Sequence, residues 1–195
     1  MMCKNINKIS TQVFNQSLQV ALPPGLTHLD SALELKRAMA VVGAGMGLTV
    51  IDGRGNTQPV LLTISSGGVR VNGITFQNAN STATTESPIM VHGGSMNGGS
   101  MPGDSHQPVE FIGVELRDLV APTGSLLLLS GHILLDHCMF RNNTAERGAH
   151  GGHQLEWSGG AVFNNKGVVS VSDSVFENNR ALVQGGAIFN NQVSE

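Results

Sequence analysis

Apolar and polar residues alternate in short runs along the chain, and one arrangement of these runs recurs four times. Each copy has apolar residues seven and five positions before an apolar anchor. The anchors are Phe76, Leu116, Phe140 and Phe176. Alternation predicts a short strand with one buried face, and the break in phase just before each anchor predicts a bend that joins two strands.

A second motif, Gly-Gly-Ala followed by a β-branched residue and Phe-Asn-Asn, begins at Gly159 and again at Gly185, 26 residues later. A repeat of this size, built from short strands and turns without a helical pattern, is typical of one rung of a parallel β-solenoid. Stacked rungs align their inward side chains into a shared core. The asparagines after the anchors favour left-handed turns, and stacking should join their amides into ladders.

The region before the first anchor follows the same pattern less regularly. Leu18, Val20 and Leu22 alternate, and residues 48–51 lead into the turn sequence Asp-Gly-Arg-Gly. These runs predict one or two initial rungs. Residues 32–40 allow two interpretations, because Leu33 and Leu35 alternate as in a strand, whereas Ser31 could cap a short helix that closes the end of the solenoid.

The domain organisation predicted from these repeats is simple. Residues 1–16 form an N-terminal extension, and residues 17–195 form one all-β domain that is truncated at its C-terminus. Two loop insertions interrupt the rungs. The first, 80–108, surrounds a candidate strand at 89–91, and the second runs from 144 to 158.

The combined motifs carry a resemblance to known proteins. Between Asp136 and Asn191, the two Gly-Gly-Ala stretches and the Phe-x-x-Asn stretches resemble the repeats of chlamydial polymorphic outer-membrane proteins. More broadly, residues 50–53 and 69–76 look like rungs of the pectin-lyase-like superfamily. This resemblance implies a right-handed parallel β-helix with three strands per rung, and an extracellular or cell-surface location.

Composition excludes some classes of function and fold. The 195 residues carry 11 Lys and Arg against 14 Asp and Glu, so no basic footprint for nucleic acid is present. Charged residues are only 13% of the chain and Gly numbers 25, which favours tight turns over helices with charged surfaces. No apolar run approaches the roughly 20 residues of a transmembrane helix.

Candidate catalytic residues come mainly from the pectin-lyase-like resemblance. Asp136, His137 and the cysteine after them are similar to a short stretch of pectate lyases in which the Asp helps to bind calcium. The aligned positions of neighbouring rungs supply no acidic cluster, so Asp136 and His137 read as outward residues at a bend. An enzyme of this fold would draw its carboxylates from four candidates. These are Asp104, Glu110, Asp118 and Asp136, and the alternative is that the catalytic residues lie in rungs outside this sequence.

Other residues carry alternative chemistry. His150, His153 and Glu156 in the second insertion have side chains that could hold zinc or another divalent ion, although the glycines around them favour a polar loop. Trp157 could stack on a sugar ring or pack over a rung. Cys138 falls at an inward position and should be a buried, unreactive thiol. No cofactor is expected.

The expected function is a non-enzymatic stalk, adhesin or module that contacts a polysaccharide or a cell-surface protein. The alternative is a polysaccharide lyase or glycoside hydrolase of the same fold. The last rung lacks strands to cover it, which predicts self-association through that end. The register also predicts that Arg141 and Glu177 face each other across neighbouring strands.

Overall fold

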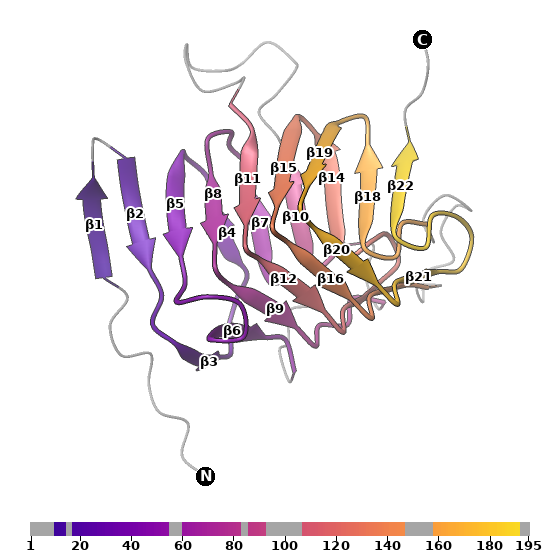
Figure 1. Cartoon of the computed structure of the whole chain (residues 1–195), viewed down its shortest axis with the longest axis horizontal. Helices are drawn as coiled ribbons and strands as arrows, with labels where there is room; N and C mark the ends of the chain where they lie inside the picture. The colour runs from indigo at the N-terminus through magenta and orange to yellow at the C-terminus, as the bar shows by residue number, and fades with distance from the viewer. Residues whose placement is uncertain are drawn as a thin grey trace.

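The chain is a right-handed parallel β-helix (Figure 1). Its computed structural model describes residues 10–14, 17–54, 60–82, 86–92, 107–146 and 158–191. Every regular element in these ranges is a strand, from β1 to β22, which confirms the all-β prediction. Most strands have three to five residues, because the alternating runs in the sequence are equally short.

The strands form four sheets, here called A to D. Sheet A contains β1 (Ser10–Phe14), β2 (Ser17–Ala21), β5 (Met39–Val42), β8 (Arg70–Asn72), β11 (Val109–Ile112), β15 (His132–Asp136) and β19 (Val168–Ser172). Sheet B contains β3 (Gly25–Thr27), β6 (Thr49–Asp52), β9 (Thr75–Gln77), β12 (Glu115–Arg117), β16 (Met139–Arg141) and β20 (Val175–Glu177). Sheet C contains β4 (Leu33–Leu35), β7 (Leu62–Ile64), β10 (Ile89–His92), β14 (Leu126–Ser130), β18 (Val162–Asn165) and β22 (Ile188–Asn191). The small sheet D contains β13 (Val120–Ala121), β17 (Thr144–Ala145) and β21 (Arg180–Ala181).

Each rung contributes one strand to sheets A, B and C, and the predicted register is confirmed. Leu116 pairs with Phe76 on one side and with Phe140 on the other, and Phe140 pairs with Phe176. The rings of Phe140 and Phe176 stack with centroids 4.6 Å apart. Aligned anchors therefore build the continuous core that the repeat predicted.

Left-handed turns also repeat from rung to rung. The residues after sheet B, Asn78, Asp118, Asn142 and Asn178, all have φ between 53° and 57°. This matches the prediction from the asparagines, because Asn and Asp tolerate this backbone region better than most residues. The amide ladders are present as well: Asn143 Nδ2 donates to Asn179 Oδ1 at 3.0 Å, and Asn164 Nδ2 donates to Asn190 Oδ1 at 2.7 Å.

The two glycines of the Gly-Gly-Ala motif have different roles. Gly159 has a φ of 70°, which only glycine adopts readily. Gly160 has no such φ, but a Cβ there would overlap the carbonyl oxygen of Gly186 in the next rung and would lie 2.5 Å from that of Arg180. The first glycine therefore makes the turn, and the second lets two rungs approach each other.

The structure distinguishes between the alternatives that the sequence left open for residues 32–40 and for the two insertions. Residues 32–40 contain β4 and β5, so the capping helix is wrong: Leu33 and Leu35 pair with β7 and bury one face of the strand. The candidate strand at 89–91 is confirmed as β10. The rungs extend into both predicted insertions, since Thr144 and Ala145 form β17 and Asn80 bridges to Val120.

The strand β1 lies within the stretch assigned from sequence to an N-terminal extension. It pairs with β2 in the antiparallel direction, whereas β2 and the later strands of sheet A run parallel. Sheet A therefore extends one strand beyond the first rung, at the end marked by β1 in Figure 1.

The predicted pair on the outer face of sheet B is confirmed. Arg141 and Glu177 occupy the same register position, and Arg141 Nε lies 3.5 Å from Glu177 Oε2. Both side chains are about half exposed, so the pair contributes no more than about 1 kcal/mol.

Cys138 lies inside the core, as predicted, with 2% of its surface exposed. Burial disfavours the thiolate and raises the pKa of this thiol to about 11. We therefore expect a Cys3→Ser variant to react with a thiol reagent near neutral pH only after denaturation. A colorimetric thiol assay with and without denaturant measures this, and rapid labelling of the folded protein would contradict the buried position.

Candidate functional site

The outer face of sheet A carries two shallow hollows that share one residue. The first, of about 400 Å³, is lined by Glu110, Ile112, Leu134, Asp136, Ser170, Val171 and Ser172. The second, of about 360 Å³, adjoins strands β5 and β8, and Glu110 also lines it. Parallel stacking places equivalent residues of β8, β11, β15 and β19 side by side, so the hollows follow one another along the helix axis.

The polar groups around the first hollow already have partners. Arg70 Nε donates to Glu110 Oε2 at 2.6 Å, and Ser172 Oγ donates to Asp136 Oδ1 at 2.8 Å. His132 Nε2 lies 3.0 Å from Ser170 Oγ. The hydrogen bond from Ser172 stabilises the carboxylate of Asp136 and lowers its pKa, with a smaller effect from His137. The hollow thus combines an apolar floor with hydrogen-bonding side chains at its rim.

Asp136, His137 and Asp173 form a cluster at the edge of this hollow. One potential ligand atom from each lies within 4.8 Å of the others, and His137 Nδ1 is 3.0 Å from Asp136 Oδ1. Two carboxylates and an imidazole are chemically suited to a divalent cation. The sequence predicted no acidic cluster at these aligned positions, so the pair of Asp136 and Asp173 was missed. The signal was present, because the register stacks the bend residues of successive rungs.

The bend residues of this cluster have unusual backbone geometry. Gly73 and Gly113 hold the equivalent positions in earlier rungs, with φ values of 63° and 56°. His137 and Asp173 adopt the same left-handed conformation, with φ values of 51° and 45°. The bend directs both side chains outward, where His137 is largely exposed.

Of the four carboxylates named for an enzyme, the structure describes three, and these three do not all lie together. Glu110 and Asp136 line the same hollow. Asp118 lies in the turn after sheet B, where it accepts a hydrogen bond from Asn142 Nδ2 at 3.1 Å. Asp104 lies outside the described residues, as do His150, His153, Glu156 and Trp157.

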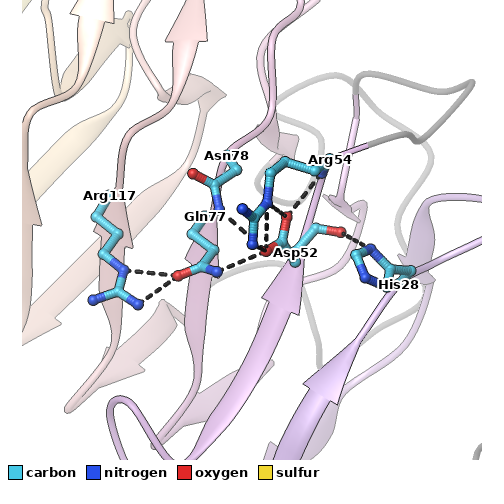
Figure 2. Close-up of polar contacts among 6 residues, drawn as sticks. All are labelled: His28, Asp52, Arg54, Gln77, Asn78 and Arg117. Atoms are coloured by element: carbon cyan, nitrogen blue, oxygen red, sulfur yellow. Dashed lines mark hydrogen bonds and ion pairs between the residues drawn. The ribbon is translucent and has the colours of Figure 1, made fainter. Parts of the chain in front are cut away.

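A buried carboxylate that the sequence analysis treated only as part of a turn organises the first rungs. The side chain of Asp52 is fully buried, and Figure 2 shows the donors around it. Arg54 Nη2 and Gln77 Nε2 each donate to Oδ2 at 2.7 Å, and Asn78 Nδ2 donates at 3.1 Å. Arg117 Nε donates to Gln77 Oε1 at 2.8 Å, which extends the network to the next rung.

Burial alone would favour protonation of Asp52, but the hydrogen bonds from Arg54, Gln77 and Asn78 outweigh this effect. They hold the pKa of Asp52 well below its usual range. Its oxygens are occupied by protein donors, so this carboxylate links rungs and is poorly placed to act as a base or metal ligand. Gln77 pairs with Asp52 in the register of sheet B, but Asp52 lies before the aligned anchors, so the repeat carried no signal of this contact.

The described part of the chain contains no helix long and apolar enough to cross a membrane. No curated protein and no solved structure matches the chain. Residues 173–191 match the Chlamydia polymorphic membrane protein repeat. They begin at Asp173 and extend through β20, β21 and β22, so the match covers most of the last rung. In that rung, the chain is similar to the repeats of these membrane proteins.

Proposed function

We propose that this chain is a non-enzymatic segment of a surface-exposed β-helix, which acts as a stalk and presents the outer face of sheet A to a polysaccharide or cell-surface protein. The main observation behind this proposal is the pair of adjoining hollows along sheet A, whose charged groups are already paired. The similarity of residues 173–191 to a repeat of chlamydial membrane proteins supports a location outside the cell.

The architecture suits an elongated ligand. Each rung advances the helix by one strand spacing, about 4.8 Å, so equivalent side chains form straight rows along the axis. In the first hollow, Ile112 and Leu134 offer apolar surface for a sugar ring or an aliphatic side chain. Ser170 and Ser172 offer hydroxyl groups at the rim, and the Arg70 to Glu110 pair offers charges of both signs. A binding face needs these groups to be held in place, and their mutual hydrogen bonds do so.

A glycan array tests this proposal, followed by titration of the best ligand by calorimetry. We expect Leu134→Glu to weaken binding at least about tenfold, because a charge replaces the apolar floor of the hollow. Thr63→Glu is the matched control, since Thr63 is a partly exposed strand residue of sheet C. Equal binding by both variants would contradict the assignment of the binding face.

A second candidate function rests on the cluster of Asp136, His137 and Asp173 beside the first hollow. A divalent cation held there could neutralise the carboxylate of an acidic glycan, as a polysaccharide lyase requires. Such an enzyme would also need a base close to the sugar carbon that loses its proton. Metal-dependent turnover distinguishes this candidate from simple binding.

A further inference from the structure

Two arginines lie side by side on the outer face of sheet B. Arg117 on β12 and Arg141 on β16 occupy the same register position, each directly after an inward anchor, so their side chains point outward. Neighbouring strands are about 4.8 Å apart, and like charges at such facing positions repel each other. Both strands lie inside sheet B, between β9 and β20, and the two side chains are 36% and 42% exposed. The β-helix therefore holds two guanidinium groups together at a surface that solvent reaches.

Most N–H groups of this arginine pair donate to no described residue. Arg117 donates from Nε and Nη2 to Gln77 Oε1 (Figure 2), and its Nη1 lies 3.8 Å from Glu115 Oε2, beyond hydrogen-bond distance. Within the described ranges, Arg141 donates no hydrogen bond. Its Nε is buried without a hydrogen-bond partner and lies 3.5 Å from Glu177 Oε2. A buried N–H group without an acceptor is costly, so these donors favour an acceptor from outside the chain.

The carboxylates on these strands and turns leave the arginine pair available to a ligand. Glu115 is buried and accepts a hydrogen bond from Thr75 Oγ1 at 3.0 Å. Asp118, in the turn after β12, accepts one from Asn142 Nδ2 at 3.1 Å. Glu177 is 54% exposed, so solvent screens its attraction to the arginine pair. None of these three carboxylates makes the close, two-bonded contact that a guanidinium group forms with a well-placed oxyanion.

We infer that Arg117 and Arg141 together bind one oxyanion, the carboxylate or sulfate group of an acidic glycan. Planar guanidinium groups match the paired oxygens of both anions. A long nucleic acid is a poor ligand, since the chain has a formal net charge of -3. The glycan class rests on the surface role proposed above. The site itself does not, because it lies on sheet B and goes beyond the binding role proposed for the hollows of sheet A.

Binding of three soluble polysaccharides tests this site. Dextran sulfate, polygalacturonate and uncharged dextran are titrated by calorimetry at low ionic strength without calcium. At least one of the two anionic polymers should bind, and Arg141→Gln should weaken that binding at least about tenfold. Arg37→Gln is the matched control, because Arg37 is an exposed arginine between β4 and β5 and its loss changes the net charge equally. The anionic polymer that binds identifies the group as sulfate or carboxylate. Binding of neither anionic polymer, or equal affinities of the two variants, would overturn the inference.

The Glu177→Gln variant separates an anion site from a surface ion pair. Glu177 competes with the ligand for Arg141, so its neutral variant should bind the anionic polymer more tightly, by about threefold. Glu34→Gln is the control, since Glu34 lies on sheet C, is 53% exposed and pairs with Lys36. It should leave the affinity unchanged. If Arg141 served only to pair with Glu177, the affinity of Glu177→Gln would be no higher than that of Glu34→Gln, and this result would overturn the inference.

Discussion

Replacing Gly160 with alanine is expected to destabilise the protein by about 3 kcal/mol. The added Cβ would overlap the carbonyl oxygen of Gly186 and lie 2.5 Å from that of Arg180, and both belong to the backbone of the next rung. The backbone cannot move away from the methyl group without breaking hydrogen bonds such as Gly160 N to Gly185 O at 3.0 Å. Chemical denaturation followed by circular dichroism measures the loss.

Gly186→Ala is the matched control, because Gly186 holds the same motif position one rung later. The nearest atom to a Cβ at Gly186 is the carbonyl oxygen of Asn179 at 3.2 Å, a contact that small shifts relieve. We expect this variant to lose less than about 1 kcal/mol. Equal losses in the two variants would show that close approach between rungs does not explain the second glycine of the motif.

Replacing Asp52 with alanine should cost about 3 kcal/mol of stability near neutral pH. The change removes an ionised, fully buried acceptor and leaves the amide of Gln77, itself 6% exposed, without its partner. Asp30→Ala is the control, since Asp30 is exposed, and it should change stability by less than about 0.5 kcal/mol. Thermal or chemical denaturation of both variants checks this difference.

The contribution of Asp52 should also depend on pH. The pKa of Asp52 is lowered in the folded protein, so its stabilising effect is fully present above its unfolded value, about 4, and is lost as the pH falls toward the folded value. The stability difference between the unmodified chain and Asp52→Ala should stay constant from about pH 5 to 8 and shrink below about pH 4. A difference that grew on acidification would contradict an ionised Asp52.

The repeating part of the fold could be predicted from sequence because each rung encodes the same local pattern. The positions before Phe140 and Phe176 alternate identically, and a register shift of one residue would turn the buried side chains of a strand toward solvent. The register of Arg141 against Glu177 follows directly from these anchors. The glycines and asparagines marked the turns, because few other residues tolerate a positive φ.

The contacts between non-repeating segments could not be predicted in the same way. Asp52 lies before the first well-aligned anchor, so nothing in the repeat revealed that Gln77 and Asn78 would donate to it. The strand β1 pairs antiparallel outside the rung pattern, and its sequence contains no copy of the motif. The cluster at Asp136 includes residues of the bends between strands. The alternation of apolar and polar residues predicts only the strands, so it did not indicate this cluster.

We propose above all that the outer face of sheet A binds its ligand and does not catalyse its breakdown. The most direct test is the release of reducing ends or unsaturated products from polygalacturonate and alginate, with and without added calcium. We expect no release above that of the Asp136→Ala variant under either condition. Turnover that Asp136→Ala abolishes, while the variant remains folded by circular dichroism, would contradict this account and establish the chain as a polysaccharide-degrading enzyme.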